Sequence, residues 1–456
     1  MTEAGTFLRM GKRGSLAERS PLFRVLQYRD FRILWIGAFV SFTGGQISNL
    51  AQGYFVFQLT HDEAKLALIP FVWSMPIFAF GLVAGSFADR FDKRRVLVIA
   101  QLLFGIDSLY MAAATYFHFV QYWQIIVIAV INGCIACIEM PTRQSIVSRV
   151  VPTEDLAAAV PVNAMTFNVA RIAGPGIGGL ILKAVGVFGC YLVDGLSYLA
   201  LVLSLRTIRA ELTSPSRPQG SLLDLVKEGA LYAIHDVRLR TLWLLELATA
   251  LFGLSYAAMM PAYATDILAG GDAERAKSLF AGAGIALGVG SFLGLLVVTQ
   301  LASSRRKGLL IRVSIGMMAL GLLGLAHTST PLFAYPALAI AGAGGIMQLN
   351  TTNALFQTLA PERLHGRVLA MHVWALNGLS PFGVLVLGTI ARATKGNAAF
   401  PLHGGVPFAF SLGGELMAIL LLVTFFTRKG LEKLHRTPDP EVTAEIAVAA
   451  PGAAMR

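Results

Sequence analysis

The stretch ILWIGAFVSFTGGQISNLAQGYFVFQLT, residues 33–60, contains no Asp, Glu, Lys or Arg. A helix needs about 20 predominantly apolar residues to cross the hydrocarbon core of a bilayer, so this stretch is long enough to span a membrane. Comparable charge-free runs occupy residues 66–88, 119–138 and 278–304. Only 14% of the chain is charged, whereas about 25% is usual in soluble domains. The sequence therefore predicts an all-α membrane protein with several transmembrane helices.

Twelve transmembrane helices are predicted along the chain, in two six-helix, pseudo-symmetric halves. The first half covers residues 33–205 and the second covers residues 241–427, and the central loop 206–240 separates them. The flanking segments are 1–32 and 428–456. The predicted spans are 33–59, 66–88, 96–117, 119–140, 156–182, 184–205, 241–265, 278–302, 309–326, 332–360, 368–391 and 404–427.

A faint internal repeat is consistent with two related halves. PTRQSIVSRVVPTEDL follows the fourth span and NTTNALFQTLAPERL follows the tenth, so that Thr142 and Pro152 recur as Thr351 and Pro361. Parallel repeats of this kind place the substrate site of several transporter folds between the two repeats.

The net charge of +11 is divided unevenly between alternate loops. One predicted side carries most of the Lys and Arg residues, within segments 9–32, 90–95, 206–240, 305–307 and 428–436. The other side carries only Lys65, Lys183, Arg275, Lys277, Arg392 and Lys395. Because Lys and Arg accumulate in cytoplasmic loops, both termini are expected in the cytoplasm. The basic surplus is thus a topology signal, and we expect no nucleic-acid partner.

The segment ARIAGPGIGG, residues 170–179, contains the G-x-G-x-x-G pattern of dinucleotide-binding loops. That pattern binds a pyrophosphate where it follows a strand and opens a helix, but here it lies inside the fifth predicted span. Gly174, Gly178 and Gly179 instead open one flank of the span to a close neighbour. Pro175 removes a backbone donor and loosens the helix. We therefore predict a helix-packing motif.

The sequence offers little for catalysis. Cys134 and Cys137 form a C-x-x-C pair inside the fourth predicted span, without an accompanying His or second pair, so no metal site is expected. The chain has no H-E-x-x-H or G-x-S-x-G motif. It also has no G-x-x-x-x-G-K loop, which would bind ATP. We expect no enzyme activity and no cofactor.

The segment GSFADRFDKRR, residues 85–95, joins the second and third predicted spans. Asp89 ends a helix, where the helix dipole disfavours a carboxylate, so this residue needs a compensating partner. The segment resembles the signature loop of the major facilitator superfamily, with Asp92 where that family usually has a glycine. The resemblance implies the major facilitator fold and a cytoplasmic latch between its halves, with the start of span eleven as the partner of Asp89. The candidate latch residues are Gly85, Asp89, Arg90, Arg94, Arg95, Glu139 and Arg143.

The motif GPGIGG resembles the glycine-proline motif of the superfamily's drug and metabolite exporters. YRDFRILWIGAFVSFTGG, DGLSYLA and PERLHGRV resemble the branch that contains bacterial siderophore exporters and macrolide-type efflux proteins. The resemblance covers about residues 25–430. The chain departs from proton-coupled drug exporters in span four, where those proteins carry an Arg three residues before Gln-Gly. Here Ala129 precedes Asn132 and Gly133.

Ionisable residues at membrane depth are functional candidates. This chain has Asp107, Arg171, Asp194, Glu246, His372 and Glu415 as candidates for proton coupling or ion pairing. We expect Arg171 and Asp194, in adjacent spans, to pair, because a lone buried charge is costly. Asp107, Asp194 and Glu415 can equally be structural hydrogen-bonding groups, whereas Glu246 and His372 lie near the cytoplasmic ends of their spans, where water can reach them. Candidates for the cavity lining are Gln46, Asn49, Asn132, Asn163, Asn168, Asn350, Asn353 and Asn377.

The sequence as a whole predicts a secondary active transporter of a bacterial inner membrane. It is expected to act as a monomer in the lipid bilayer and to export a lipophilic drug-like or siderophore-like small molecule by alternating access, with protons as the coupling ion. A lipid or lysolipid flippase of the same fold is the alternative. A membrane-embedded enzyme or a channel fits the pattern less well.

Overall fold

The computed structural model describes residues 25–88, 91–152, 155–212, 231–232, 234–301, 304, 306–360, 368, 372, 374–426 and 431. In the first part of the chain the helices are α3 (Arg29–Thr60), α4 (Glu63–Ala88), α5 (Lys93–Tyr116), α6 (Tyr122–Val150) and α7 (Leu156–Thr207). In the second part they are α9 (Val237–Ala248), η2 (Thr249–Gly253), α10 (Tyr256–Ala262), η3 (Tyr263–Leu268), α11 (Ala273–Gln300), α12 (Lys307–Ala326), α13 (Pro331–Leu359), η5 (Ala375–Leu379), α15 (Ser380–Thr394), η6 (Pro401–His403) and α16 (Val406–Phe426).

Aspartates fix the start of several helices. Asp92, Asp236 and Asp272 each accept hydrogen bonds from backbone N–H groups in the first turn of α5, α9 and α11. A side-chain acceptor at this position satisfies donors that the helix itself leaves unpaired. Asp92 therefore has a structural use at the place where the superfamily loop usually has a glycine.

The longest helix, α7, turns back on itself. A straight helix of its 52 residues would be about 78 Å long, which greatly exceeds the roughly 30 Å thickness of a bilayer core. Gly186 interrupts it with a φ of 78°, a conformation that glycine adopts without strain. Beyond this turn Cys190 Sγ lies 3.6 Å from the carbonyl oxygen of Gly178, a contact that a straight helix cannot make.

In the described part of the chain, ten helical stretches are long and apolar enough to cross a membrane, whereas the sequence predicts twelve spans. Helix α3, the first predicted span, is not among the ten, and polar residues such as Gln46 and Asn49 lower its mean hydropathy. Helix α7 counts once, as Met165–Thr207, although it carries the predicted spans 156–182 and 184–205. The twelve-span arrangement stays a prediction.

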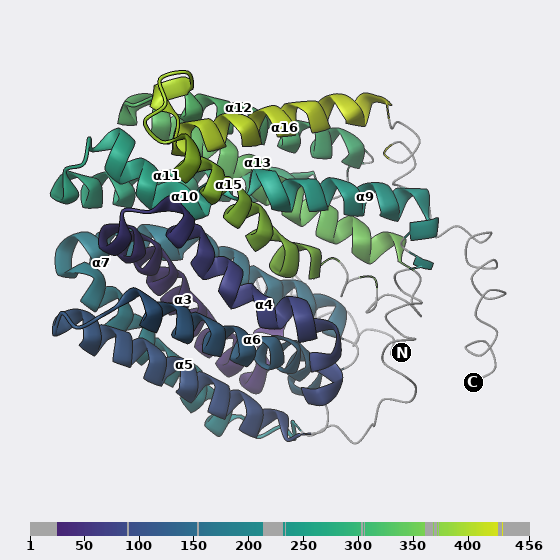
Figure 1. The fold of residues 1–456 in the computed structure, drawn as a ribbon. Coiled ribbons are helices and arrows are strands. Elements are labelled where there is room, and N and C mark those ends of the chain that lie inside the picture. Colours follow the sequence, from purple (N-terminus) through teal and green to yellow (C-terminus); the bar gives the residue numbers. More distant parts are fainter. Residues whose placement is uncertain are drawn as a thin grey trace, which may run out of the picture.

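The helices gather in two groups (Figure 1). Helices α3 to α7 pack on one another and form what we call the N-terminal bundle, and α9 to α16 form the C-terminal bundle. The two bundles meet mainly where α7 packs on α11 and α4 packs on α15. We call the end at which α3, α5 and α12 begin the basic end, because it carries Arg29, Arg95 and Lys307. The other is the far end, where α3 stops.

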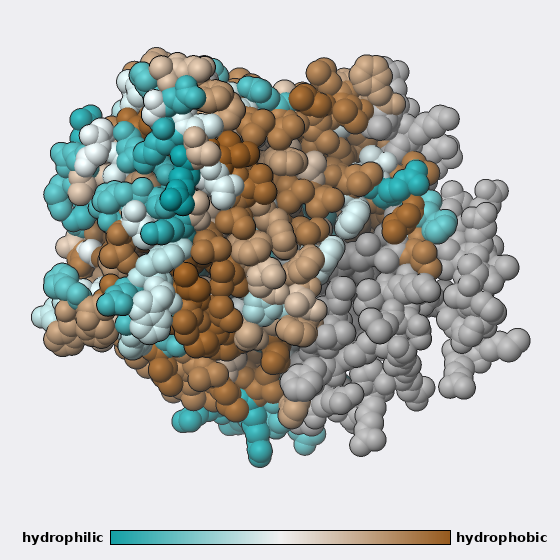
Figure 2. Space-filling view, in the orientation of Figure 1, coloured by the Kyte–Doolittle hydropathy of each residue, from teal (hydrophilic) through white to brown (hydrophobic). Residues whose placement is uncertain are grey.

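The outside of the molecule is apolar over much of its length. Figure 2 shows a broad hydrophobic region across the middle of one face and hydrophilic residues gathered at its left edge. Large side chains on the outer faces of the helices are highly exposed, among them Ile106, Leu203 and Leu320, each at 62%. Exposed apolar area of this extent marks a surface that contacts another apolar phase.

Candidate functional site

The glycine-proline motif of α7 lies where the two bundles touch. A β-carbon added at Gly179 would lie 2.7 Å from the Cα of Ala281 on α11. On the same side, the carbonyl oxygen of Pro175 would lie 3.0 Å from a β-carbon at Gly284. Glycine therefore lets the backbones of α7 and α11 approach to a distance that a side chain on either would prevent.

Two other glycines of the motif, Gly174 and Gly178, face α3 within the N-terminal bundle. A β-carbon at Gly178 would lie 3.2 Å from the Cα of Ile47, and one at Gly174 would overlap the side chain of Gln46. One turn of α7 thus packs on α3 and on α11 at the same time. The motif is a packing element at the bundle interface, and no strand precedes it in the described chain.

Aromatic side chains form the second contact between the bundles. The rings of Phe78 on α4 and Trp374 stack with centroids 5.3 Å apart, and Trp374 Nε1 donates to the carbonyl of Phe78 at 3.3 Å. Phe382 on α15 lies against Phe71 and Phe78, with centroids 4.9 and 5.2 Å away. Such ring pairs add about 0.5–1.5 kcal/mol each beyond their buried area.

Two of the predicted cavity residues meet across the interface. Asn168 on α7 donates from Nδ2 to Oδ1 of Asn350 on α13 at 3.4 Å. Asn353, one turn further along α13, instead accepts from Gln357 on its own helix at 3.2 Å. Asn49 is exposed, and the remaining candidates are half-buried: Gln46, Asn132, Asn163 and Asn377.

A buried ion pair lies inside the N-terminal bundle. Arg143 Nε is 2.9 Å from Glu139 Oε1, and both side chains are less than 10% exposed. Gln101 on α5 donates to Glu139 at 3.2 Å. The Arg143 guanidinium lies 3.9 Å from the ring centre of Phe42 and 4.5 Å from that of Phe167. The network therefore joins α3, α5, α6 and α7.

The expected ion pair between Arg171 and Asp194 is absent from the described residues. Asp194 is buried and accepts from Ser108 Oγ on α5 at 2.8 Å, whereas Arg171 is exposed on α7. The turn at Gly186 explains the difference. Arg171 precedes it by 15 residues and Asp194 follows it by 8, so the two lie about 22 and 12 Å from the turn along their arms. Although Arg171 and Asp194 lie in adjacent spans, they therefore lie at different depths in the bundle.

Two further carboxylates at membrane depth, Asp107 and Glu415, form no ion pair with another described residue. Asp107 is half-buried on α5, and its Oδ2 is buried without a hydrogen-bond partner among the described residues. Glu415 is exposed on α16 and accepts from Ser411 at 2.8 Å.

Glu246 and His372, which the sequence treats as separate candidates, form a buried pair. His372 Nδ1 lies 2.6 Å from Glu246 Oε1, and their side chains are 6% and 2% exposed. Glu246 belongs to α9, and His372 comes shortly before η5. The ring of Phe356 on α13 lies 5.2 Å from the imidazole, centre to centre.

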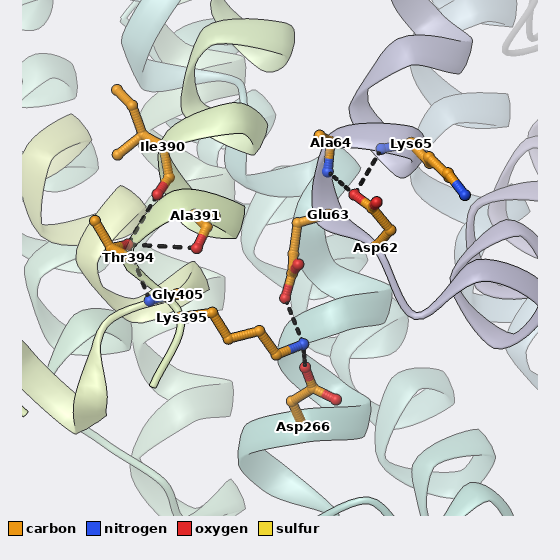
Figure 3. Close-up of polar contacts among 10 residues, drawn as sticks. All are labelled: Asp62, Glu63, Ala64, Lys65, Asp266, Ile390, Ala391, Thr394, Lys395 and Gly405. Atoms are coloured by element: carbon orange, nitrogen blue, oxygen red, sulfur yellow. Dashed lines mark hydrogen bonds and ion pairs between the residues drawn. The ribbon is translucent and has the colours of Figure 1, made fainter. Parts of the chain in front are cut away.

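Five charged residues form a cluster at the far end. Lys395 Nζ lies 2.7 Å from Glu63 Oε1 and 2.7 Å from Asp266 Oδ2, so one ammonium joins α4 to η3 and α15 (Figure 3). Beside it, Arg392 Nη1 lies 3.2 Å from Asp62 Oδ2. Both ion pairs to Asp62 and Glu63 cross from one bundle to the other. Sequence reasoning used Arg392 and Lys395 only for topology and missed this cluster.

The burial of the two ends of the Lys395–Glu63 pair differs. The Glu63 side chain is 2% exposed and that of Lys395 is 44% exposed. Partial burial alone would lower the pKa of Lys395, but the hydrogen bonds and charges of Asp266 and Glu63 outweigh it and raise the pKa above its usual value.

The predicted latch falls partly outside the described residues, since Asp89 and Arg90 are not among them, whereas Gly85 lies in the last turn of α4. Arg94 Nη2 donates to the carbonyls of Ile208 and Ala210, at 2.8 and 2.9 Å. That contact stays within the N-terminal part of the chain. Arg95 is exposed, and its backbone N–H donates to Asp92.

Comparison with known proteins places this architecture in a family. Residues 20–450 match the model of a family described as transmembrane secretion effector, within the major facilitator superfamily. The chain belongs to this family. It is therefore a multi-pass membrane transporter of the major facilitator superfamily.

Several relatives match over most of their length. The staphyloferrin A transporter of Staphylococcus aureus is 22% identical, over 87% of this chain and 95% of the relative. The multidrug efflux pump Tap of Mycolicibacterium fortuitum is 25% identical, over 84% and 92%. The enterobactin exporter EntS of Shigella flexneri is 24% identical, over 91% and 95%.

The fold has solved counterparts. A bacterial homologue of the human lysosomal transporter Spinster, in an inward-facing and unoccupied conformation, superposes with a TM-score of 0.66. It is 14% identical and covers 93% of this chain and 100% of its own. At this identity the likeness concerns the fold alone.

Proposed function

We propose that this protein exports a lipophilic drug-like or siderophore-like small molecule across a bacterial inner membrane, in exchange for protons. The observation that carries the proposal is the match to an efflux pump and a siderophore exporter over more than four fifths of the chain. Fold alone does not select a substrate, so the substrate class comes from these relatives.

Alternating access is the mechanism that the bundle interface supports. The two bundles meet through α7 and α11, through α4 and α15, and through Lys395. Transporters of this kind rock one repeat against the other around a site at their interface. We propose that Asn168 and Asn350, which bond across that interface, border the substrate path.

The basic end is proposed to face the cytoplasm, because Lys and Arg accumulate in cytoplasmic loops. The far end then faces outward, and the Lys395 cluster closes the outer side of the path. On the inner side, the latch centred on Asp89 is proposed as its counterpart. The latch must be formed whenever the outer cluster is broken, since a path open to both sides would leak.

Inside-out membrane vesicles test the function directly. With an acidic lumen, vesicles that contain the protein should accumulate ethidium or enterobactin faster than vesicles without it, and collapsing the pH gradient should abolish the difference. Accumulation that does not depend on the gradient would exclude proton exchange. Movement of a fluorescent lysolipid, with neither ethidium nor enterobactin transported, would favour the flippase alternative.

A further inference from the structure

We propose that Glu246 and His372 together form the site that binds and releases the coupling proton. The inference rests on the proposed proton-driven export and names the residues that perform it. A carboxylate and an imidazole in contact can hold different numbers of protons at physiological pH, because histidine titrates in this range. The proton is taken from water on one side of the membrane and released to water on the other. No bond other than its own O–H or N–H forms or breaks.

Among the described residues, Glu246 and His372 form no ion pair with a third charged side chain, so the protons on the pair set its net charge. Among the described residues of the elements packed against it, α13, η2 and η5 carry no Asp, Glu, Lys, Arg or His. Helix α16 contributes Glu415, which is bonded to Ser411. On α9 the charged residues are Arg238, paired with Asp236, and the exposed Arg240.

One shared proton makes the pair neutral overall, as carboxylate with imidazolium or as acid with imidazole. A second proton leaves a net positive charge, and loss of the only proton leaves a net negative one. Either change puts an uncompensated charge in a site that is nearly closed to water, which is costly. The pair must then move apart, gain water or return to a single proton, by releasing the second proton or by taking up the missing one.

The two helical segments that carry the pair also carry three members of the Lys395 cluster, namely Asp266, Arg392 and Lys395. Asp266 lies two residues before the end of the stretch Val237–Leu268 and Glu246 lies nine residues after its start, while His372 and Lys395 flank Ala375–Thr394. These two segments are thus joined by ion pairs at two separate levels. The proton site lies toward the basic end, and the Lys395 cluster closes the far end.

A less regular backbone follows each member of the pair. Three residues after Glu246 the chain enters the π-helix η2, and three residues after His372 it enters the π-helix η5. π-Helical turns are rare in proteins overall, and those that occur are often found at functional sites. They offer places where the segments can rewind when the pair changes its charge, and so alter the position of Asp266 and Lys395.

Infrared difference spectroscopy on protein reconstituted in lipid tests the proton site without any substrate. Stepping the pH from about 5 to about 9, which brackets the usual range of a coupled carboxyl and imidazole, should show a protonated-carboxyl band that Glu246→Gln removes. His372→Gln should move the pH at which the band appears. Glu415→Gln is the matched control in the same bundle and should leave the band unchanged. A band that persists intact in Glu246→Gln overturns the inference.

Transport separates this inference from the proposed function. In vesicles, Glu246→Gln should retain exchange of ethidium at equilibrium but lose at least tenfold in accumulation driven by the pH gradient. A wild-type protein that ignores the gradient, with the Glu246 band present, would refute proton-driven export and leave the proton-binding site. Gradient-driven accumulation that is equal in wild type and Glu246→Gln would refute the site. The double variant Glu246→Gln/His372→Gln, which leaves no lone charge, distinguishes loss of coupling from misfolding.

Discussion

Lys395 Nζ lies 2.7 Å from Oε1 of Glu63, and the two residues belong to different bundles and stand 332 positions apart in the chain. The same ammonium also bonds Asp266 of its own bundle. In the proposed alternating-access cycle, an ion pair between the two bundles contributes only to the conformation in which it forms. We therefore expect it to bias the balance between outward-closed and outward-open states.

Replacement of Lys395 by Ala should favour the outward-open state. Glu63 then remains buried without its cation. Because the ammonium is partly exposed, we expect a cost of about 1–2 kcal/mol, less than for a fully buried pair. A cysteine at Leu50, on α3 near α11, should then react about 5- to 30-fold faster with a membrane-impermeant maleimide added outside. Lys395→Arg, which keeps a cation between Glu63 and Asp266, should keep labelling slow. Equal rates in all variants would contradict an outer closure at this site.

The same contact should resist alkaline pH. The raised pKa of Lys395 means that its stabilising contribution is fully present below the usual pKa of 10.5. The contribution is lost only as the pH rises through the higher folded-state value. Labelling at position 50 should therefore stay constant from about pH 7 to about pH 9 after correction for thiol ionisation. A rise over this range in wild type, absent from Lys395→Arg, would show that the lysine deprotonates earlier.

Gly179→Ala should loosen the contact between α7 and α11. Its added methyl group would lie 2.7 Å from the Cα of Ala281, and overpacking of this kind costs about 1–3 kcal/mol. Gly176→Ala is the control from the same motif, because its nearest neighbour is 3.9 Å away. We expect a lower melting temperature and reduced transport for Gly179→Ala only. Similar losses for both variants would mean that helix propensity or the fold, not this contact, is responsible.

Glu139 and Arg143 should show strong coupling in a double-mutant cycle. Removing either partner leaves a buried charge and should destabilise the protein by about 3–5 kcal/mol, whereas Glu139→Gln/Arg143→Met removes both charges and should cost less than the sum. Thermal unfolding in detergent measures the effect, and Arg95→Gln serves as the exposed control. Additive losses would indicate that the two charges do not stabilise each other.

Local spacing predicts some of these contacts and not others. The i,i+4 spacing of Glu139 and Arg143 puts both on one helix face, and they lie 2.9 Å apart, while their membership of the latch stays a prediction. The small residues of the glycine-proline motif indicate close packing but not which helices approach. Neither Lys395 with Glu63 nor Glu246 with His372 could be paired from the sequence, because each pair is set by how distant helices pack.

Depth within the membrane is harder to predict than membership of a span. Arg171 and Asp194 lie in adjacent predicted spans, but the position of the turn at Gly186 decides whether they are level, and a spacing pattern does not reveal it. Hydropathy similarly identifies apolar stretches without their ends. The polar residues of α3 therefore lower its mean hydropathy, and hydropathy alone does not reveal that this helix packs on α7 near the bundle interface.

The orientation of the protein can be tested across a single helix. Gly271 and Arg306 lie beyond the two ends of α11, Ala273–Gln300, and both are exposed. If the basic end is cytoplasmic, a cysteine at position 271 should react with an impermeant maleimide in intact cells, and one at position 306 only after permeabilisation. The background should lack the exposed natural Cys134. The reverse pattern would invert the proposed orientation and turn the Lys395 cluster into an inner closure, whereas labelling of both positions from one side would mean that α11 does not cross the membrane.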